Sequence, residues 1–201
     1  EDLAPNQVAI AGYFCDNLDK TFAGQRYLAR QLRYVSRSKA VPLNATDLGD
    51  LNVFPLETEK HFSSVISQCE AVLELGAYLV LVGGDSSGLK ALGAAVQNVI
   101  NPDVPIVSLS NNNKLNLSKT QKIILSVDLK ELAGKWLSKP RRLNGLSPSQ
   151  IISQINDIPN KIIAVAIFGL APELDSRGST ETQVALNILE AVVKRLDKGA
   201  H

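Results

Sequence analysis

The stretch that decides the fold is YLVLVGGDSSG, from Tyr78 to Gly88. Residues 78–82 form a continuous apolar run, which predicts a strand buried on both faces, as in a parallel sheet. Gly83 and Gly84 close this strand, and Ser86 or Ser87 can cap a helix that continues to about Val99. A strand followed directly by a helix is typical of α/β folds.

Similar segments alternate on both sides of this stretch. Further strands are predicted at Val8–Ala11, 40–45, Ile106–Leu109, Ile123–Val127 and Lys161–Phe168. Helices are predicted at 24–36, at Thr58–Leu75, from Ser147 and Pro148 onward, and at Thr180–Leu196. Thr46 to Asp50 is predicted to be a polar loop. This alternation predicts an α/β fold around a mostly parallel sheet.

The composition argues against several classes of function. The chain has 201 residues, a length that suits one domain, and 21 basic groups nearly cancel 20 acidic ones. A net charge of +1 gives no electrostatic reason to expect a nucleic-acid partner. No apolar run reaches membrane-spanning length, and Glu1 to Ile10 does not resemble a signal peptide. We therefore expect a cytoplasmic protein without a membrane partner. We expect Cys15 and Cys69 to be reduced, with a disulfide between them as the alternative.

Ligands of open α/β sheets bind outside the carboxyl ends of the strands. Three interpretations of residues 83–88 stay open there. The glycines could hold a phosphate, Ser86 or Ser87 could be a nucleophile with His61 as its base, or Asp85 or Ser86 could simply cap the helix. The usual phosphate-loop spacings and the Gly-x-Ser-x-Gly motif are absent, which favours the turn and cap.

Two aspartates follow other predicted strands. Asp128 ends the strand at 123–127 and is a candidate metal ligand, but a catalytic metal usually needs three protein ligands. Lys130 adds a positive charge that would repel a metal ion at this position. Asp175, after the last strand, lies in a segment that reads as a turn leading to a helix.

Several short motifs, taken in order, resemble the ureohydrolases, the family of arginase, agmatinase and formimidoylglutamase. Residues 81–87 (LVGGDSS) are similar to the family's Leu-Gly-Gly-Asp-His-Ser motif, and residues 126–130 (SVDLK) to its Ser-x-Asp-x-Asp motif. Residues 47–50 (DLGD) resemble its Asp-x-Gly-Asp segment. The stretches Gly24–Arg30, 145–147, 172–175 and 178–180 also resemble family segments. The resemblance covers nearly the whole chain.

This resemblance implies a three-layer α/β/α sandwich and a pair of manganese ions that activate water to attack a guanidinium or formimino carbon. At the matching positions, however, Ser86 stands where the family has a metal-binding histidine, and Lys130 where it has its second aspartate. Gly169 replaces a substrate-binding glutamate. Asp128 alone keeps a ligand identity among the aligned positions. The candidate cleft residues are thus Gly83, Gly84, Asp85, Ser86, Asp128, Lys130, Gly169 and Asp175.

The resemblance also implies an Asp-x-His-x-Asp motif after the strand at 106–109, where Ser110 instead runs into Asn111. The chain offers few residues before the next strand and has no methionine. Either this segment is deleted in the protein, or residues are missing near 110–111, which the absence of methionine favours. We therefore interpret residues 1–201 as a single ureohydrolase-like domain and take the second alternative as our hypothesis. An intact mass of 21.7 kDa would contradict this.

Three hypotheses follow from these residues. The first is a divergent ureohydrolase-like protein without the dinuclear manganese activity, whose cleft binds a small molecule or serves an interaction. The second is an active hydrolase of linear amidines, namely formimidoylglutamate, agmatine or arginine. The third is an unrelated α/β module that binds an anion. No cofactor is expected under the first, and manganese under the second. We also expect a homo-oligomer.

Overall fold

The computed structural model describes residues 3–16, 23–37, 43–109, 121–133, 136–137, 145–172 and 180–198. Within them the chain forms one sheet of six parallel strands in the order β2-β1-β3-β6-β5-β4. The strands are β1 Val8–Gly12, β2 Thr46–Asp50, β3 Tyr78–Val82, β4 Ile106–Ser108, β5 Lys122–Asp128 and β6 Lys161–Phe168. The predicted parallel α/β sheet is confirmed.

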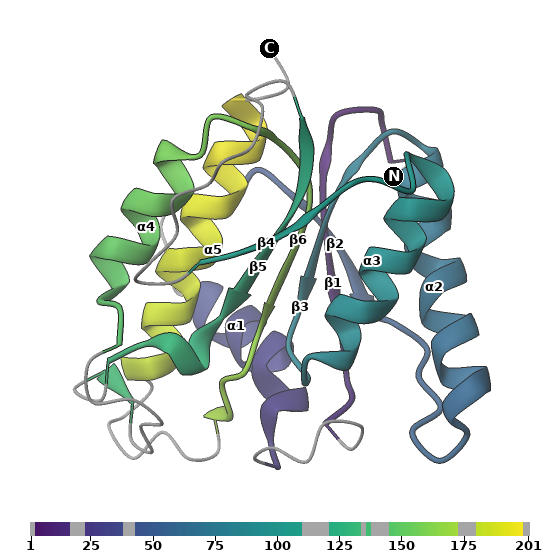
Figure 1. The fold of residues 1–201 in the computed structure, drawn as a ribbon. Coiled ribbons are helices and arrows are strands. Elements are labelled where there is room, and N and C mark those ends of the chain that lie inside the picture. Colours follow the sequence, from purple (N-terminus) through teal and green to yellow (C-terminus); the bar gives the residue numbers. More distant parts are fainter. Residues whose placement is uncertain are drawn as a thin grey trace.

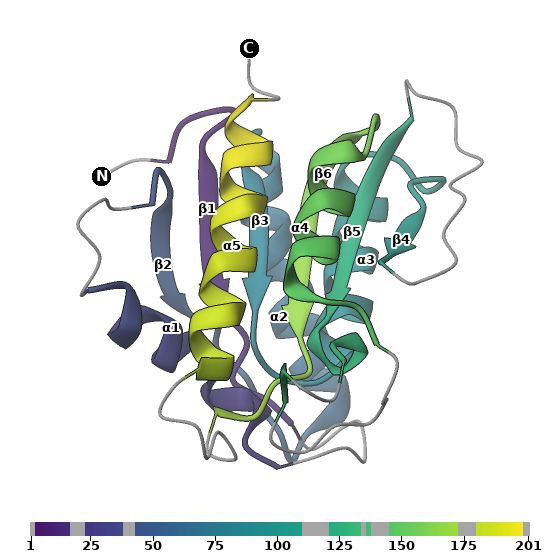
Figure 2. The same ribbon diagram turned by 90° about the vertical axis from the view of Figure 1, so that its left-hand side faces the viewer.

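Helices cover both faces of the sheet, as Figures 1 and 2 show. One face carries α1 Leu28–Ser36, α4 Pro148–Asp157 and α5 Thr180–Lys198, and the other carries α2 Thr58–Glu74 and α3 Ser87–Val99. Short 3-10 helices, η1 Gln25–Tyr27 and η2 Leu129–Glu131, follow β1 and β5 along the chain. The predicted three-layer α/β/α sandwich is therefore also confirmed.

Two hydrophobic cores separate these layers, because successive side chains of a strand point to opposite faces of the sheet. In β3, Val80 and Val82 pack toward the side of α1, α4 and α5, whereas Leu79 and Leu81 pack toward α2 and α3. A strand that serves both cores has no polar face, which explains the continuous apolar run at 78–82.

The second strand differs from the prediction. Residues 46–50, expected to form a loop, are strand β2 at the edge of the sheet, paired only with β1 among the described strands. Leu43 to Ala45, expected to lie in a strand, precede it as bend and irregular structure, and residues 40–42 lie outside the described part. Because β2 is an edge strand, it tolerates polar residues such as Asp47 that a central strand would exclude.

A local sequence signal explains where α4 begins. Ser147 caps α4 through a complete capping box with Gln150, and Pro148 occupies the first turn.

Cys15 and Cys69 are both buried, and they form no disulfide with each other. Burial raises the pKa of the Cys69 thiol to about 12.

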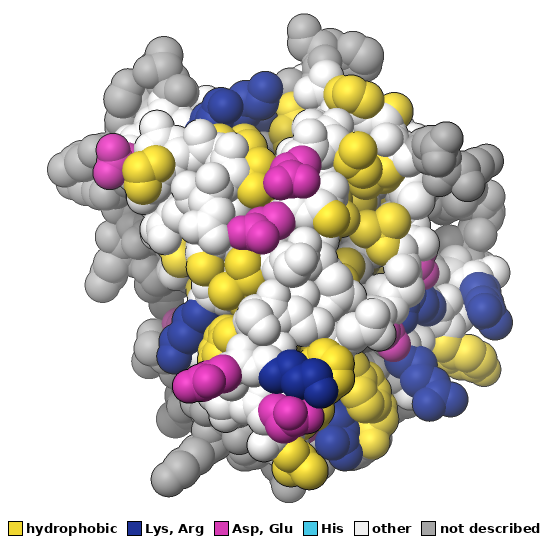
Figure 3. All heavy atoms as spheres, turned by 90° about the vertical axis from the view of Figure 1, so that its right-hand side faces the viewer, with side chains coloured by type: hydrophobic (Ala, Val, Ile, Leu, Met, Phe, Trp, Pro, Cys, Tyr) yellow, Lys and Arg dark blue, Asp and Glu magenta, His cyan; other side chains and the backbone are white. Residues whose placement is uncertain are grey.

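The surface over α2 and α3 carries acidic and basic side chains interspersed with scattered hydrophobic ones (Figure 3). In the described part of the chain, no helix combines the length and the apolar character needed to cross a bilayer.

Candidate functional site

The carboxyl ends of β3, β6 and β5 bring most of the predicted site residues to one edge of the sheet. Gly83 to Ser86 follow β3, Gly169 follows β6, and Asp128 ends β5 and leads into the short helix that holds Lys130. Because β6 lies between β3 and β5, these strand ends are neighbours. Asp175 lies outside the described residues.

Lys130 and Asp128 form a partly buried ion pair at this edge. The Lys130 Nζ lies 3.6 Å from Oδ2 of Asp128, and the Lys130 backbone N–H donates to Oδ1 at 3.0 Å. Lys130 is only 8% exposed. Burial raises the pKa of Asp128, while the hydrogen bond and the charge of Lys130 oppose that rise.

Gly169 lies directly against this pair. Its φ of +91° belongs to the left-handed region, which glycine adopts without steric cost. A Cβ placed at this position would collide with Oδ1 of Asp128 and would lie 3.0 Å from Cε of Lys130. The Lys130 side chain therefore occupies space that any larger residue at position 169 would need.

These side chains do not fit a manganese centre. Manganese prefers oxygen ligands such as carboxylates, but Ser86 offers a neutral hydroxyl, Lys130 an ammonium group and Gly169 no side chain. The ammonium of Lys130 would also repel a divalent cation bound to Asp128. Within the described residues, no group of three or more His, Cys, Asp or Glu side chains is arranged to hold a metal ion.

The turn after β3 has little capacity to bind an anion. The N–H groups of Gly83, Gly84 and Asp85 each donate to a carbonyl oxygen at 2.8–3.0 Å, namely those of Ile167, Gln25 and Cys15. The Asp85 carboxylate accepts a hydrogen bond from the backbone N–H of Ser87, at the start of α3. Asp85 thus occupies the place that a bound anion would take, in agreement with its expected capping role.

A buried polar chain behind this turn was not anticipated from the sequence. The hydroxyl of Tyr13, just after β1, lies 2.6 Å from Nε2 of His61 and 2.6 Å from Oγ of Ser87. Ser87 in turn donates to the carboxylate of Asp85. His61, which the sequence offered as a possible base for a serine, is therefore linked to Ser87 through Tyr13.

Which atom donates in each of these hydrogen bonds follows from the groups at the two ends of the series, the Phe54 backbone N–H and the Asp85 carboxylate. The backbone N–H of Phe54 donates to Nδ1 of His61 at 3.2 Å, so the imidazole proton resides on Nε2. Nε2–H then donates to Tyr13, Tyr13 donates to Ser87, and Ser87 donates to the carboxylate. All four side chains are at most 3% exposed, so no substrate reaches them.

Burial keeps the middle of this chain uncharged. It raises the pKa of the Tyr13 phenol and lowers the pKa of His61, although the charge of Asp85 opposes the shift at His61. These hydrogen bonds therefore join the end of β1, α2 and the start of α3. The sequence did signal the burial of His61, because it shares the buried face of α2 with Val65, Cys69 and Leu73 at intervals of four residues.

Comparisons with known proteins identify the fold. No family model matches the chain, and no curated protein matches its sequence. Among solved structures, proclavaminate amidino hydrolase from Streptomyces clavuligerus matches with a TM-score of 0.82 and 14% identity, covering 99% of this chain and 94% of that one. Formimidoylglutamase from Bacillus subtilis matches with a TM-score of 0.77 and 13% identity, covering 98% and 89%.

A formiminoglutamase variant from Trypanosoma cruzi, solved with Mn²⁺, has a TM-score of 0.73 and 14% identity, covering 94% of this chain and 93% of that one. The chain therefore has the ureohydrolase fold, as the motifs indicated. This fold differs from the unrelated architecture that the third hypothesis assumed.

Proposed function

We propose that this chain is a ureohydrolase-fold protein that acts by binding, without the dinuclear manganese hydrolase activity. The observation that supports this most directly is the ion pair between Lys130 and Asp128. In this pair, the cation beside the Asp128 carboxylate is the Lys130 ammonium group, which belongs to the protein itself. The proposal includes a single domain, a cytoplasmic location and a homo-oligomer.

The chemistry of an ammonium group supports this proposal. In metal hydrolases, the divalent ion generates a hydroxide by lowering the pKa of a bound water. An ammonium group carries one charge and has no open coordination position for water. Lys130 therefore balances the charge of Asp128 without supplying the activated nucleophile that amidine hydrolysis requires.

Metal analysis combined with an activity panel tests the proposal. The protein should be produced with added Mn²⁺, analysed for metal, and assayed with arginine, agmatine and formimidoylglutamate. We expect no stoichiometric metal and no hydrolysis above that of the buffer. Stoichiometric manganese together with turnover of any of these substrates would establish the active hydrolase instead.

A charge-reversal variant makes this test sharper. Lys130→Asp places a second carboxylate beside Asp128, so Mn²⁺ should raise the melting temperature of this variant through preferential binding to the folded state. Wild type should show no such shift. Lys122→Asp, at the opposite end of β5, makes the same charge change in an exposed residue and is the control. Equal stabilisation of wild type and Lys130→Asp would contradict the proposal.

A further inference from the structure

A cavity of about 220 Å³ lies on the α1 and α5 side of the sheet. Its walls come from α1, α5 and strands β1, β2 and β3, whose arrangement is visible in Figure 2. None of the residues that line it belongs to the candidate site described above. The lining residues are Ile10, Ala29, Leu32, Arg33, Ser36, Arg37, Leu43, Ala45, Asp47, Val82, Leu186, Leu189 and Glu190.

The interior of this cavity is apolar. Ile10 and Val82 rise from the sheet, Leu32 comes from α1, and Leu186 and Leu189 come from α5. An apolar cavity of about 150 Å³ is large enough to hold benzene. The present cavity therefore has room for one aromatic ring, or a branched aliphatic body, with a short substituent.

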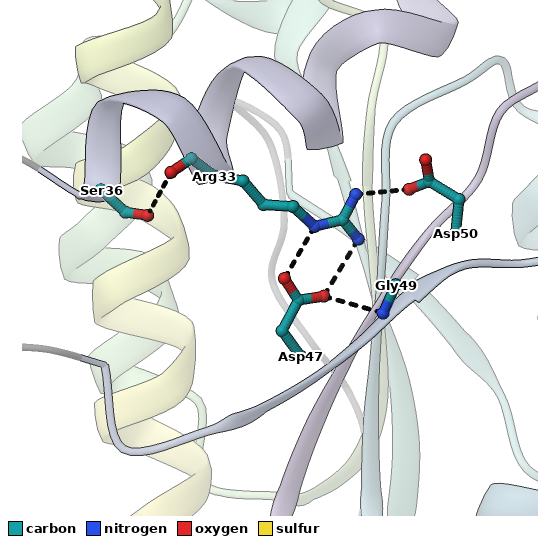
Figure 4. A network of polar contacts seen from close by, with 5 residues as sticks. All are labelled: Arg33, Ser36, Asp47, Gly49 and Asp50. Atoms are coloured by element: carbon teal, nitrogen blue, oxygen red, sulfur yellow. Dashed lines mark hydrogen bonds and ion pairs between the residues drawn. The ribbon is translucent and has the colours of Figure 1, made fainter.

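The charged groups at its rim are mostly engaged with each other. Arg33 donates from Nε and Nη2 to the carboxylate of Asp47 at 2.7 and 3.0 Å, and from Nη1 to Asp50 at 2.5 Å (Figure 4). Asp47 also accepts the N–H of Gly49. Against the opposing effect of burial, the Arg33 hydrogen bonds hold the pKa of Asp47 below its ordinary value. This cluster is a fixed part of the wall.

Arg37 differs from these groups. It follows Arg33 by one helical turn at the end of α1, lines the same cavity, and is exposed. Among the described residues its side chain has no ion pair or hydrogen bond, whereas Glu190 on the α5 side already has an interaction partner within the protein. Within the described part of the chain, the charged side chain at this rim that is free to pair with a ligand is therefore the guanidinium of Arg37.

We propose that this cavity is a binding site for a small monocarboxylate with an aromatic or branched apolar body. The body fills the space between Leu32, Val82 and Leu186, and the carboxylate pairs with the guanidinium of Arg37. A guanidinium is the side chain best suited to hold a carboxylate, because its N–H groups match the two oxygens. This site is separate from the edge that holds Asp128 and Lys130, so it does not depend on the function proposed there.

Three probes of similar shape and different charge test the proposal. Benzoate, benzyl alcohol and benzylamine are each titrated into the full chain, with calorimetry and melting temperature as readouts. We expect benzoate to bind and to raise the melting temperature, and both other probes to bind more weakly. No binding of benzoate at millimolar concentration, or tighter binding of benzylamine, would overturn the proposal.

Variants locate the bound probe. Arg37→Gln should weaken benzoate binding about fivefold, the loss expected for a partly exposed ion pair. Arg30→Gln removes the same charge from an exposed position on α1 that does not line the cavity, and it should leave the affinity unchanged. Ala45→Phe should fill the cavity and abolish binding while the protein stays folded. Benzoate binding that survives both Arg37→Gln and Ala45→Phe would place the probe elsewhere and refute the assignment.

Discussion

The ammonium group of Lys130 lies 3.6 Å from Oδ2 of Asp128, at the edge of the sheet where β5 ends. The Lys130 side chain is 10% exposed and the Asp128 side chain 28% exposed, so neither charge is fully hydrated. Each group thus offsets the cost of burying the other. A metal-binding carboxylate in this fold would need the same compensation from a metal ion. The same ion pair therefore contributes to the stability of the folded protein and supports the proposed absence of hydrolase activity.

Removing the ammonium group should therefore destabilise the protein. Breaking a fully buried pair costs about 3–5 kcal/mol. Because Asp128 is partly hydrated, we expect Lys130→Met to lower the free energy of unfolding by about 1–2 kcal/mol. The double variant Asp128→Asn/Lys130→Met should recover part of this loss. Urea unfolding of the two single variants and the double variant measures the coupling, and additive effects would show that the two groups do not interact.

The pH dependence of the stability of Lys130→Met is a second test of the interaction between Lys130 and Asp128. Burial raises the pKa of Asp128 above its ordinary value of 3.8, so the folded state holds this proton more tightly than the unfolded state. The stabilisation from protonation is complete below the unfolded pKa and is lost as the pH rises through the folded one. Without Lys130 this shift should grow. The stability deficit of Lys130→Met should consequently shrink between about pH 7 and about pH 4.

The hydroxyl of Tyr13 should also contribute to stability. Tyr13→Phe leaves His61 and Ser87 without their shared partner in a buried environment. An unsatisfied buried polar group costs about 1–3 kcal/mol, and we expect a loss of this size in urea unfolding. Tyr34→Phe removes the same hydroxyl from a residue that is 73% exposed, and it serves as the control. Equal losses of stability in Tyr13→Phe and Tyr34→Phe would contradict a contribution from the buried hydrogen bonds of Tyr13.

His61 should make the folded state sensitive to mild acid. Burial lowers the pKa of His61 below its ordinary value of 6.5, so the folded state binds this proton less tightly than the unfolded state. The resulting stability is complete above that value and is lost as the pH falls below it. His61→Gln should flatten the dependence of the urea midpoint on pH in this window. His201→Gln, the change at the other histidine, is the comparison, and an unchanged slope in His61→Gln would exclude the imidazole as the cause.

The strands that were predicted well from sequence are those with a strong and local signal. Residues 78–82 and 161–168 were expected as strands and are strands with those bounds, because burial on both faces demands an unbroken apolar run. Residues 46–50 were misjudged because an edge strand carries polar side chains. Asp47 and Asp50 there both pair with Arg33 on α1, a contact across 14 and 17 residues that periodicity does not reveal.

The candidate site was predictable only in part for a similar reason. The positions of Gly83, Asp128 and Gly169 at one edge follow from parallel strands and their order. The chain from His61 through Tyr13 to Ser87 joins residues 48 and 74 positions apart, and no local pattern encodes that meeting. Likewise, the sequence placed Lys130 near Asp128, but only the structure reveals that its side chain occupies the space beside Gly169.

That occupied space leads to a last prediction, based on two glycines with similar backbones and different surroundings. Gly169 and Gly49 have φ of +91° and +80°, so an alanine at either position should cost about 1–2 kcal/mol in backbone strain. A Cβ at Gly49 meets nothing within 4 Å, whereas at Gly169 it collides with Asp128 and crowds Lys130. Such crowding adds about 1–3 kcal/mol.

We therefore expect Gly169→Ala to lose clearly more stability than Gly49→Ala, with urea unfolding as the measurement. The excess should shrink in a Lys130→Ala background, because removing Cγ and Cε frees part of the space next to Gly169. The remaining collision with Asp128 should keep some of the cost. If both glycine variants lost the same stability, backbone strain alone would account for the result, and Lys130 would not occupy the place of a larger side chain at position 169.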